Sequence, residues 1–261
     1  MLHESQESFI SAGESVNLLT DGLKIALSKE CRLYVIVPII FNFLLLTSVG
    51  LYLYFNLTSF VNEATNGLLP DWLSFLAPIV EPLLACLLAA LIIFLSFYFF
   101  STLATLIASP FYGLLADRVE KLLNNTQSED LGFKGIIKDI PRIIKRELKK
   151  QLFFWPRALL CCLISIIPLV NAVSPLCWFL LSAWMSCLQY TDYAYDNHKI
   201  SFMTMRQDLA ANKLATVFLG GFIAIGMMIP IINLLLPPAA VCAGTKYYLM
   251  VQKHYAVTKE L

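Results

Sequence analysis

The chain contains one phrase twice, first as Ile167-Pro168-Leu169-Val170-Asn171 and then as Ile229-Pro230-Ile231-Ile232-Asn233. Each copy lies near the centre of a stretch without charged residues, 158–191 for the first and 214–245 for the second. Proline has no backbone N–H to donate within a helix and clashes with the preceding turn. The phrase therefore predicts a break that divides each uncharged stretch into two halves.

The length of these halves decides what they can do. Each has about 13 residues and, as a helix, reaches only ~20 Å, whereas the hydrocarbon core of a bilayer is ~30 Å thick. We therefore expect two re-entrant helical hairpins, at about 158–190 and 214–245. Their tips would be formed by Pro168, Asn171, Pro230 and Asn233. Paired broken apolar segments are also a pointer to a transport site.

The composition is that of an integral membrane protein. Apolar residues make up 58% of the chain and charged residues 14%, against roughly half and a quarter in soluble domains. We expect one all-α membrane domain over residues 1–261, without room for a separate soluble catalytic domain. The seven cysteines show no Cys-x-x-Cys or Cys/His metal spacing, which favours apolar packing over a disulfide scaffold or a metal site.

Two further uncharged runs are long enough to cross the bilayer. They occupy about 33–61 and 82–109, and we expect each to be a full transmembrane helix. The connecting loop, 62–81, contains no Lys or Arg, whereas ten of the nineteen Lys and Arg fall within 118–157. The positive-inside rule then places the loop outside and the basic region and both termini in the cytoplasm.

The region 117–157 carries the pattern of a basic amphipathic helix. Apolar residues recur every four positions from Ile136 to Leu152, and Lys and Arg occupy the faces between them. One interpretation is a helix lying on the anionic lipid surface. The other is that part of the basic face gathers an anionic substrate. Trp155-Pro156-Arg157 is expected to turn the chain into the first hairpin, and 246–261 is expected to be a short polar tail.

Asp192, Asp196 and His198 form the first group of candidate functional residues. Their side chains could bind a divalent metal or act as an acid/base pair. They could equally form a polar turn, with the carboxylates pairing with Lys199 or Arg206. A proton-relay or gating role is the third possibility, because histidine titrates near neutral pH.

Two more groups flank the predicted spans. Arg118 and Glu120 follow the second span and form either a surface ion pair or, if drawn into the helix bundle, a functional pair. Gly22, Leu23 and Lys24 precede the first span, together with Arg32. Glycine permits close approach to the backbone, and amides at a helix start bind anions. The alternative is that Lys24 and Arg32 only anchor the first span on the cytoplasmic side, as the positive-inside rule describes.

Several segments together resemble the CysZ sulfate-uptake family of bacteria. They are 110–116, the run Asp139-Ile140-Pro141-Arg142-Ile143-Ile144-Lys145-Arg146-Glu147, 192–199 and the two repeated phrases in the same order. The resemblance covers about 22–245. It implies an inner-membrane sulfate permease that serves cysteine biosynthesis, with two spanning helices, two half-inserted hairpins and a homo-oligomeric assembly.

The resemblance also implies a sulfate site. The family's Gly-Leu-Arg motif corresponds to Gly22-Leu23-Lys24, with lysine in place of arginine, and Arg32 matches an arginine that follows it. Lysine retains the charge but cannot pair with an oxyanion through two parallel hydrogen bonds.

We therefore expect a sulfate transporter that requires no cofactor. No phosphate-binding loop motif is present, so transport would be channel-like or driven by a gradient, for example of protons. Arg118, Glu120, Asp192, Asp196 and His198 are the candidates for gating or proton coupling. Sulfite and thiosulfate are alternative ligands, and membrane lipids are expected partners. Other hypotheses are a membrane scaffold or regulator and a metal-dependent enzyme that uses the Asp192, Asp196 and His198 cluster.

Overall fold

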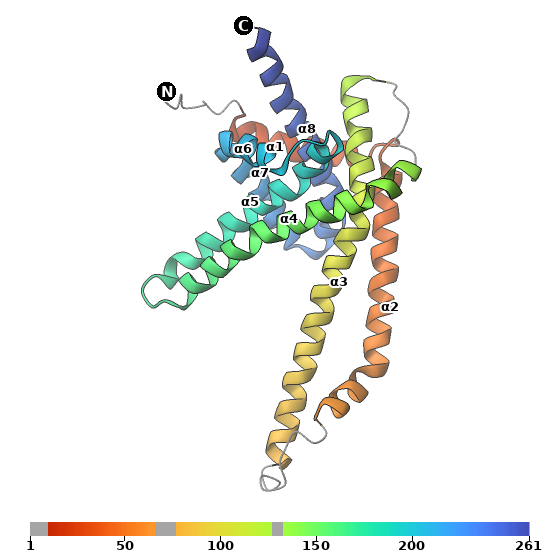
Figure 1. Cartoon of the computed structure of the whole chain (residues 1–261), viewed down its shortest axis with the longest axis vertical. Coiled ribbons are helices and arrows are strands. Elements are labelled where there is room, and N and C mark those ends of the chain that lie inside the picture. The colour runs from red at the N-terminus through yellow and green to blue at the C-terminus, as the bar shows by residue number, and fades with distance from the viewer. Residues whose placement is uncertain (1–9, 66–76, 127–132, 261) are drawn as a thin grey trace. The chain divides into compact units, whose positions relative to one another are not determined.

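The computed structural model describes residues 10–65, 77–126 and 133–260, and every regular element within these ranges is a helix (Figure 1). The all-α prediction is confirmed at this level. Most of the predicted external loop lies outside the described residues, at 66–76. The chain forms two compact units, Pro38–Ala108 and the combination of Met1–Val37 with Ser109–Leu261.

The predicted spans fall within two long helices, α2 (Arg32–Thr65) and α3 (Ala77–Asn124). Within the described ranges, three helical segments could cross a membrane by length and composition: Arg32–Val61, Pro78–Ser96 and Asn171–Asn197. A fourth candidate consists of α6 (Phe202–Ala211) and α7 (Lys213–Met227), which meet at a bend of 101°. The chain is thus a helical protein with several apolar helices suited to a membrane.

The larger unit has a core built from α1 (Ala12–Ala26), α5 (Ser174–Asn197), α7 and α8 (Pro230–Glu260). Small residues allow these helices to approach closely, as is common in membrane bundles. A Cβ atom added at Gly220 of α7 would lie 1.8 Å from the carbonyl oxygen of Ala183 on α5. Only glycine fits at such a contact.

The N-terminal helix α1 is fixed at its start by a capping box. The Ser11 hydroxyl accepts from the backbone N–H of Glu14, and the Glu14 carboxylate accepts from the backbone N–H of Ser11. The Ser15 hydroxyl then donates to the carbonyl of Ala215 at the start of α7, over 3.1 Å. These bonds satisfy free amides of the helix start and attach α1 to the core.

The first repeated phrase joins α4 (Phe133–Ile166) to α5 as a helical hairpin, which Figure 1 shows as two neighbouring ribbons. Helix α4 ends directly before Ile167, and a short 3₁₀ turn, η2 (Asn171–Val173), leads into α5. Near the tip, the Trp178 indole donates to the hydroxyl of Ser165 over 3.3 Å. The break predicted from the Pro-Asn phrase is therefore present.

The second phrase separates α7 from α8 in a related way. Helix α7 ends at Met227, and α8 begins at Pro230, a position that suits proline because its missing N–H has no partner there. In both copies the asparagine N–H donates to the isoleucine carbonyl four residues earlier, Asn171 to Ile167 and Asn233 to Ile229.

Two expectations about continuity are wrong. The chain does not turn at Trp155-Pro156-Arg157, because α4 continues through Pro141 and Pro156 to Ile166. The segment after Lys246 is also not a polar tail, because α8 extends to Glu260 and buries Tyr247 and Val251 in the core. One missing N–H does not end a helix whose neighbours pack against it.

Candidate functional site

Helices α4 and α5 face each other with rows of opposite charge. On α4, Arg142, Arg146 and Lys150 recur every four residues, and on α5 the carboxylates of Asp192 and Asp196 have the same spacing. Residues four apart lie on one face of a helix. The sequence of each helix therefore presents one charged stripe to the other, and we call these five residues the charge ladder.

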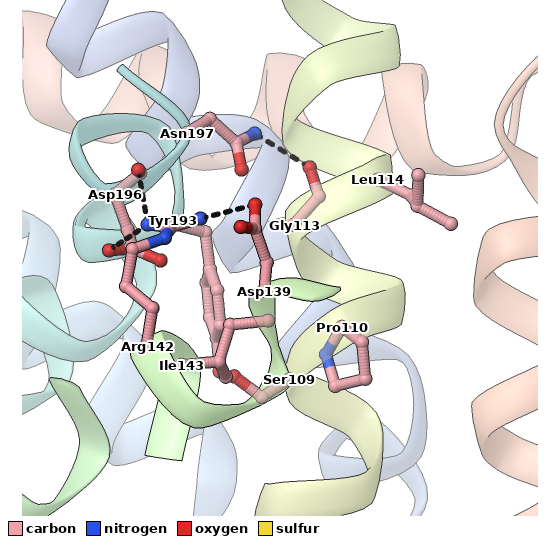
Figure 2. A pocket seen from close by; sticks show the side chains of 10 residues that line it. All are labelled: Ser109, Pro110, Gly113, Leu114, Asp139, Arg142, Ile143, Tyr193, Asp196 and Asn197. Atoms are coloured by element: carbon pink, nitrogen blue, oxygen red, sulfur yellow. Dashed lines mark hydrogen bonds and ion pairs between the residues drawn. The ribbon is translucent and has the colours of Figure 1, made fainter. Parts of the chain in front are cut away.

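The charge ladder is closed by short ion pairs. The Arg142 guanidinium lies 2.5 Å from the Asp196 carboxylate and also donates to the Asp196 backbone carbonyl over 2.7 Å. Arg146 donates through Nε to Asp192 over 2.8 Å, and Lys150 Nζ lies 3.2 Å from the same carboxylate. Arg142 also pairs with Asp139 one turn earlier on α4 (Figure 2).

The inner part of the charge ladder is buried. The side chains of Lys150 and Asp192 are 1% and 2% exposed, and that of Arg146 is 10% exposed. Burial alone would lower the pKa of Lys150, but the carboxylates of Asp192 and Glu147 raise it above the usual value. Lys150 therefore stays protonated at neutral pH.

Glu147 links this cluster to α3. Its carboxylate accepts from Lys150 over 2.6 Å and from the Ser109 hydroxyl over 3.2 Å. The Lys150 ammonium also lies 5.1 Å from the ring centroid of Tyr193, a favourable cation–π distance. Two carboxylates thus balance the buried Lys150 and Arg146 charges.

The end of α5 is held against the last part of α3. The Asn197 amide donates to the carbonyl of Gly113 over 2.7 Å (Figure 2). The His198 imidazole lies 2.7 Å from the Glu120 carboxylate and stacks on the ring of Tyr248. The hydrogen bond to Glu120 raises the pKa of His198 above its usual value.

Two cavities open beside the charge ladder, and Arg142 and Asp196 line both. The smaller, of about 70 Å³, is shown in Figure 2 and lies between α3, α4 and α5. The larger, of about 250 Å³, is mainly cationic, and we call it the basic cavity. It is lined by Arg142, Lys145, Arg146, Lys149, Asp196, Lys199, Ile200, Ser201 and Phe202.

Comparison with known proteins assigns the chain to a family. The model of the family described as sulfate transporter CysZ/etoposide-induced protein 2.4 matches residues 18–238. The chain belongs to this family. The match spans all the residues singled out in the sequence, from Gly22 to Asn233, and the resemblance predicted from the sequence is confirmed.

Curated CysZ relatives match over nearly the whole chain. A protein of Vibrio atlanticus named sulfate transporter CysZ is 41% identical over 241 residues, which are 92% of this chain and 94% of the relative. A Vibrio parahaemolyticus protein of the same name is 40% identical, with 89% and 93% covered. One from Salmonella typhimurium is 38% identical, with 88% and 89% covered.

The structure places the predicted CysZ sulfate residues on and beside α1. Gly22 and Leu23 lie within α1, not at a helix start, so the part of the prediction that used helix-start amides is wrong. Gly22 is buried against α8, and an added Cβ would lie 2.4 Å from the Ala239 carbonyl oxygen. The side chain of Lys24 is 80% exposed and lies 3.7 Å from Asp21. Arg32 is exposed at the start of α2.

The gating candidates divide between two sites. Glu120 and His198 meet each other, whereas Asp192 and Asp196 lie in the charge ladder and not against Lys199 or Arg206. Arg118 is half-buried on α3.

The same contacts bear on the metal hypothesis. Asp192, Asp196 and His198 each face a different partner, and among the described residues no group of three or more His, Cys, Asp or Glu gathers.

Sequence reasoning found the basic residues of α4 but not their partners. It assigned Arg142, Arg146 and Lys150 to a lipid surface or an anion-gathering face. The matching four-residue spacing of Asp192 and Asp196 was the available signal. Recognising it required knowing that α4 and α5 are antiparallel neighbours, which the expected turn at Pro156 obscured.

Proposed function

We propose that this protein transports sulfate across the bacterial inner membrane. The observation that carries the proposal is the identity of about 40%, over about nine-tenths of the chain, with proteins named sulfate transporter CysZ. A cavity rich in cations beside a buried charge ladder agrees with an anionic substrate. We therefore propose that the protein is a transporter and not an enzyme.

In the proposed arrangement, α2 and α3 span the bilayer and the two hairpins are re-entrant. Exposed large apolar side chains support this membrane arrangement. At the first tip they are Leu159, Leu160, Leu163, Ile166, Ile167 and Leu169. Leu169 is 97% exposed, and an apolar surface of this extent requires lipid or a partner. A second copy of the chain and lipids are the proposed partners, so the protein acts as a multi-pass homo-oligomer.

Sulfate capture is proposed at Lys24 and Arg32, beside Gly22 and Leu23. Both cationic side chains are accessible. Asp21 does not neutralise Lys24 strongly, because its carboxylate lies 2.6 Å from Lys246 and 3.7 Å from Lys24. The pKa of Asp21 is lowered mainly by the hydrogen bond from Lys246. The exposed Lys24 ammonium group is thus available to a dianion.

Gating is proposed at the contacts that hold the end of α5. Arg118 and the Glu120–His198 pair lie at the α3 end of this region, and Asp192 and Asp196 lie in the charge ladder. A histidine that exchanges protons near neutral pH can couple such a contact to pH.

Uptake of radiolabelled sulfate into proteoliposomes tests the function. We expect uptake above that of empty liposomes, and a clear loss in the double variant Lys24→Ala, Arg32→Ala. Lys253→Ala, an exposed position on α8, is the matched control and should transport normally. Uptake equal to empty liposomes with protein that is folded by circular dichroism would overturn the proposal.

A further inference from the structure

The basic cavity contains more positive charge than the described carboxylates compensate. Five cationic side chains and one carboxylate line it. Arg142 and Arg146 are paired with aspartates of the charge ladder. Among the described residues, no carboxylate forms an ion pair with Lys145, Lys149 or Lys199. Three ammonium groups therefore face one small space without counter-charge.

One nitrogen in each of two guanidinium groups beside the cavity forms no hydrogen bond. Nη2 of Arg146 lies 2.7 Å from the Asp192 carboxylate, but its geometry gives no hydrogen bond there. Nε of Arg142 is also buried and without an acceptor. Buried donors normally have a partner. Both nitrogens are closed to solvent, so the two guanidinium groups would act on an oxyanion in the cavity through their positive charge.

The start of α6 adds to the positive field. Ser201 caps α6, and both Ser201 and Phe202 line the basic cavity. The N-terminus of a helix carries a partial positive charge and free amides, which favour an anion. The Arg146 side chain reaches the same place, since its Nη1 donates to the carbonyl of Ile200 over 2.7 Å.

Lys199 occupies an unfavourable backbone position at the rim of the cavity. Its φ angle is 56°, in the left-handed region that favours glycine or asparagine. The N–H of Lys199 donates to Asp196, and that of Ile200 donates to Tyr195, so the turn is fixed. The lysine in this turn places an ammonium group at the cavity, at a position whose backbone would favour glycine.

We propose that the basic cavity is a second oxyanion site, separate from Lys24 and Arg32, which binds a tetrahedral dianionic group. Sulfate, inorganic phosphate and the phosphate of an anionic lipid share this chemistry. A volume of about 250 Å³ exceeds that of several water molecules at roughly 30 Å³ each, so it accommodates the group together with its remaining water. Arg142, Arg146 and Lys149 hold it on α4, and Lys199 closes it from the turn before α6.

Lysine footprinting of the full-length protein tests the site directly. Acetylation of Lys145, Lys149 and Lys199 is measured by mass spectrometry in detergent, with and without sulfate or phosphate. It is also measured in nanodiscs of phosphatidylglycerol or of phosphatidylcholine. Lys253 on α8 is the internal control. We expect roughly tenfold slower acetylation of the three cavity lysines when the oxyanion is bound, with Lys253 unchanged.

The outcomes separate the two sources of the group. Protection by free sulfate or phosphate supports a soluble oxyanion, and protection only in phosphatidylglycerol supports a lipid headgroup. Cavity lysines whose acetylation rate, relative to that of Lys253, is the same under all five conditions would overturn the proposal. Sulfate uptake is measured separately from lysine acetylation. Absence of protection at the cavity lysines would therefore not contradict sulfate transport, and absence of uptake would not contradict the second oxyanion site.

The variant Lys199→Gly tests the site with a substitution that the backbone of the fold favours. Lys199→Gly removes one ammonium group and relieves the left-handed backbone, so thermal stability should rise or stay equal. Its affinity for the protecting oxyanion should fall roughly tenfold, the loss of one good charge-assisted hydrogen bond. The control is Lys213→Ala at an exposed position of α7, because glycine would destabilise that helix. Unchanged protection of Lys145 and Lys149 in Lys199→Gly would count against the site.

Discussion

Individual residues in this protein carry roles that depend on burial more than on residue type. Lys149 and Lys150 are neighbours on α4, yet Lys149 is exposed and Lys150 is 1% exposed between two carboxylates. Both positions contribute to the same basic pattern in the sequence. The buried one holds α4 against α5, whereas the exposed one faces the basic cavity.

Replacing Lys150 with methionine should strongly destabilise the protein. Removal of one partner leaves buried Asp192 and Glu147 carboxylates insufficiently compensated, a loss of about 3–5 kcal/mol. Chemical unfolding in detergent, followed by tryptophan fluorescence, measures it. Lys149→Met is the matched control and should change the free energy of unfolding by no more than about 0.5 kcal/mol. Equal effects at both positions would contradict the buried ion pairs.

Gly22 offers a test that separates packing from anion binding. Gly22→Ala places a Cβ atom 2.4 Å from the Ala239 carbonyl oxygen, and we expect a loss of about 1–3 kcal/mol from overpacking. Gly13→Ala on the same helix has no neighbour within 4 Å and should gain up to about 1 kcal/mol. Loss of sulfate binding in Gly22→Ala without loss of stability would favour a binding role over packing.

The His198–Glu120 pair should make stability depend on pH. The folded-state pKa of His198 is raised by Glu120, so its stabilising contribution is complete below the unfolded pKa of about 6.5. The contribution is lost as pH rises through the folded pKa. The difference in Tm between the natural protein and His198→Gln should therefore shrink from pH ~5.5 to ~8.5.

At the scale of elements, the repeated phrase determines where helices end, and this was predictable. Proline and asparagine act locally, so the break before Ile167 and the start of α8 at Pro230 follow from a few residues. The passage of α4 through Pro156 was not predictable in the same way. Its tolerance depends on the packing of α4 against α5, a contact between residues distant in the chain.

The exposed tip of the first hairpin gives a test at this scale. Leu169 has a φ of 70° and is almost fully exposed, a costly position for leucine in water. The variant Leu169→Cys, in a chain without its native cysteines, should react much more slowly with a membrane-impermeant maleimide in liposomes than in detergent. The variant Lys253→Cys in the same background should react at similar rates in both. Rapid labelling at 169 in liposomes would exclude insertion of the tip.

At the scale of the whole molecule, composition was sufficient for the class of fold but not for the sites. An apolar fraction of 58% predicts a helical membrane protein because unpaired backbone groups cannot lie in lipid. The basic cavity requires α4, the end of α5 and the start of α6 to meet. Sequence spacing gives the charges of each element but not which elements meet, so the cavity could not be predicted.

The equal spacing in the charge ladder has a consequence for movement. Arg142, Arg146 and Lys150 repeat at one helical turn, and Asp192 and Asp196 have the same repeat. A slide of α4 along α5 by four residues, about 6 Å, would bring Arg146 opposite Asp196 and Lys150 opposite Asp192. Arg142 would retain Asp139. Such a second register would leave Asp192 and Asp196 paired, which a ratchet between two discrete positions requires.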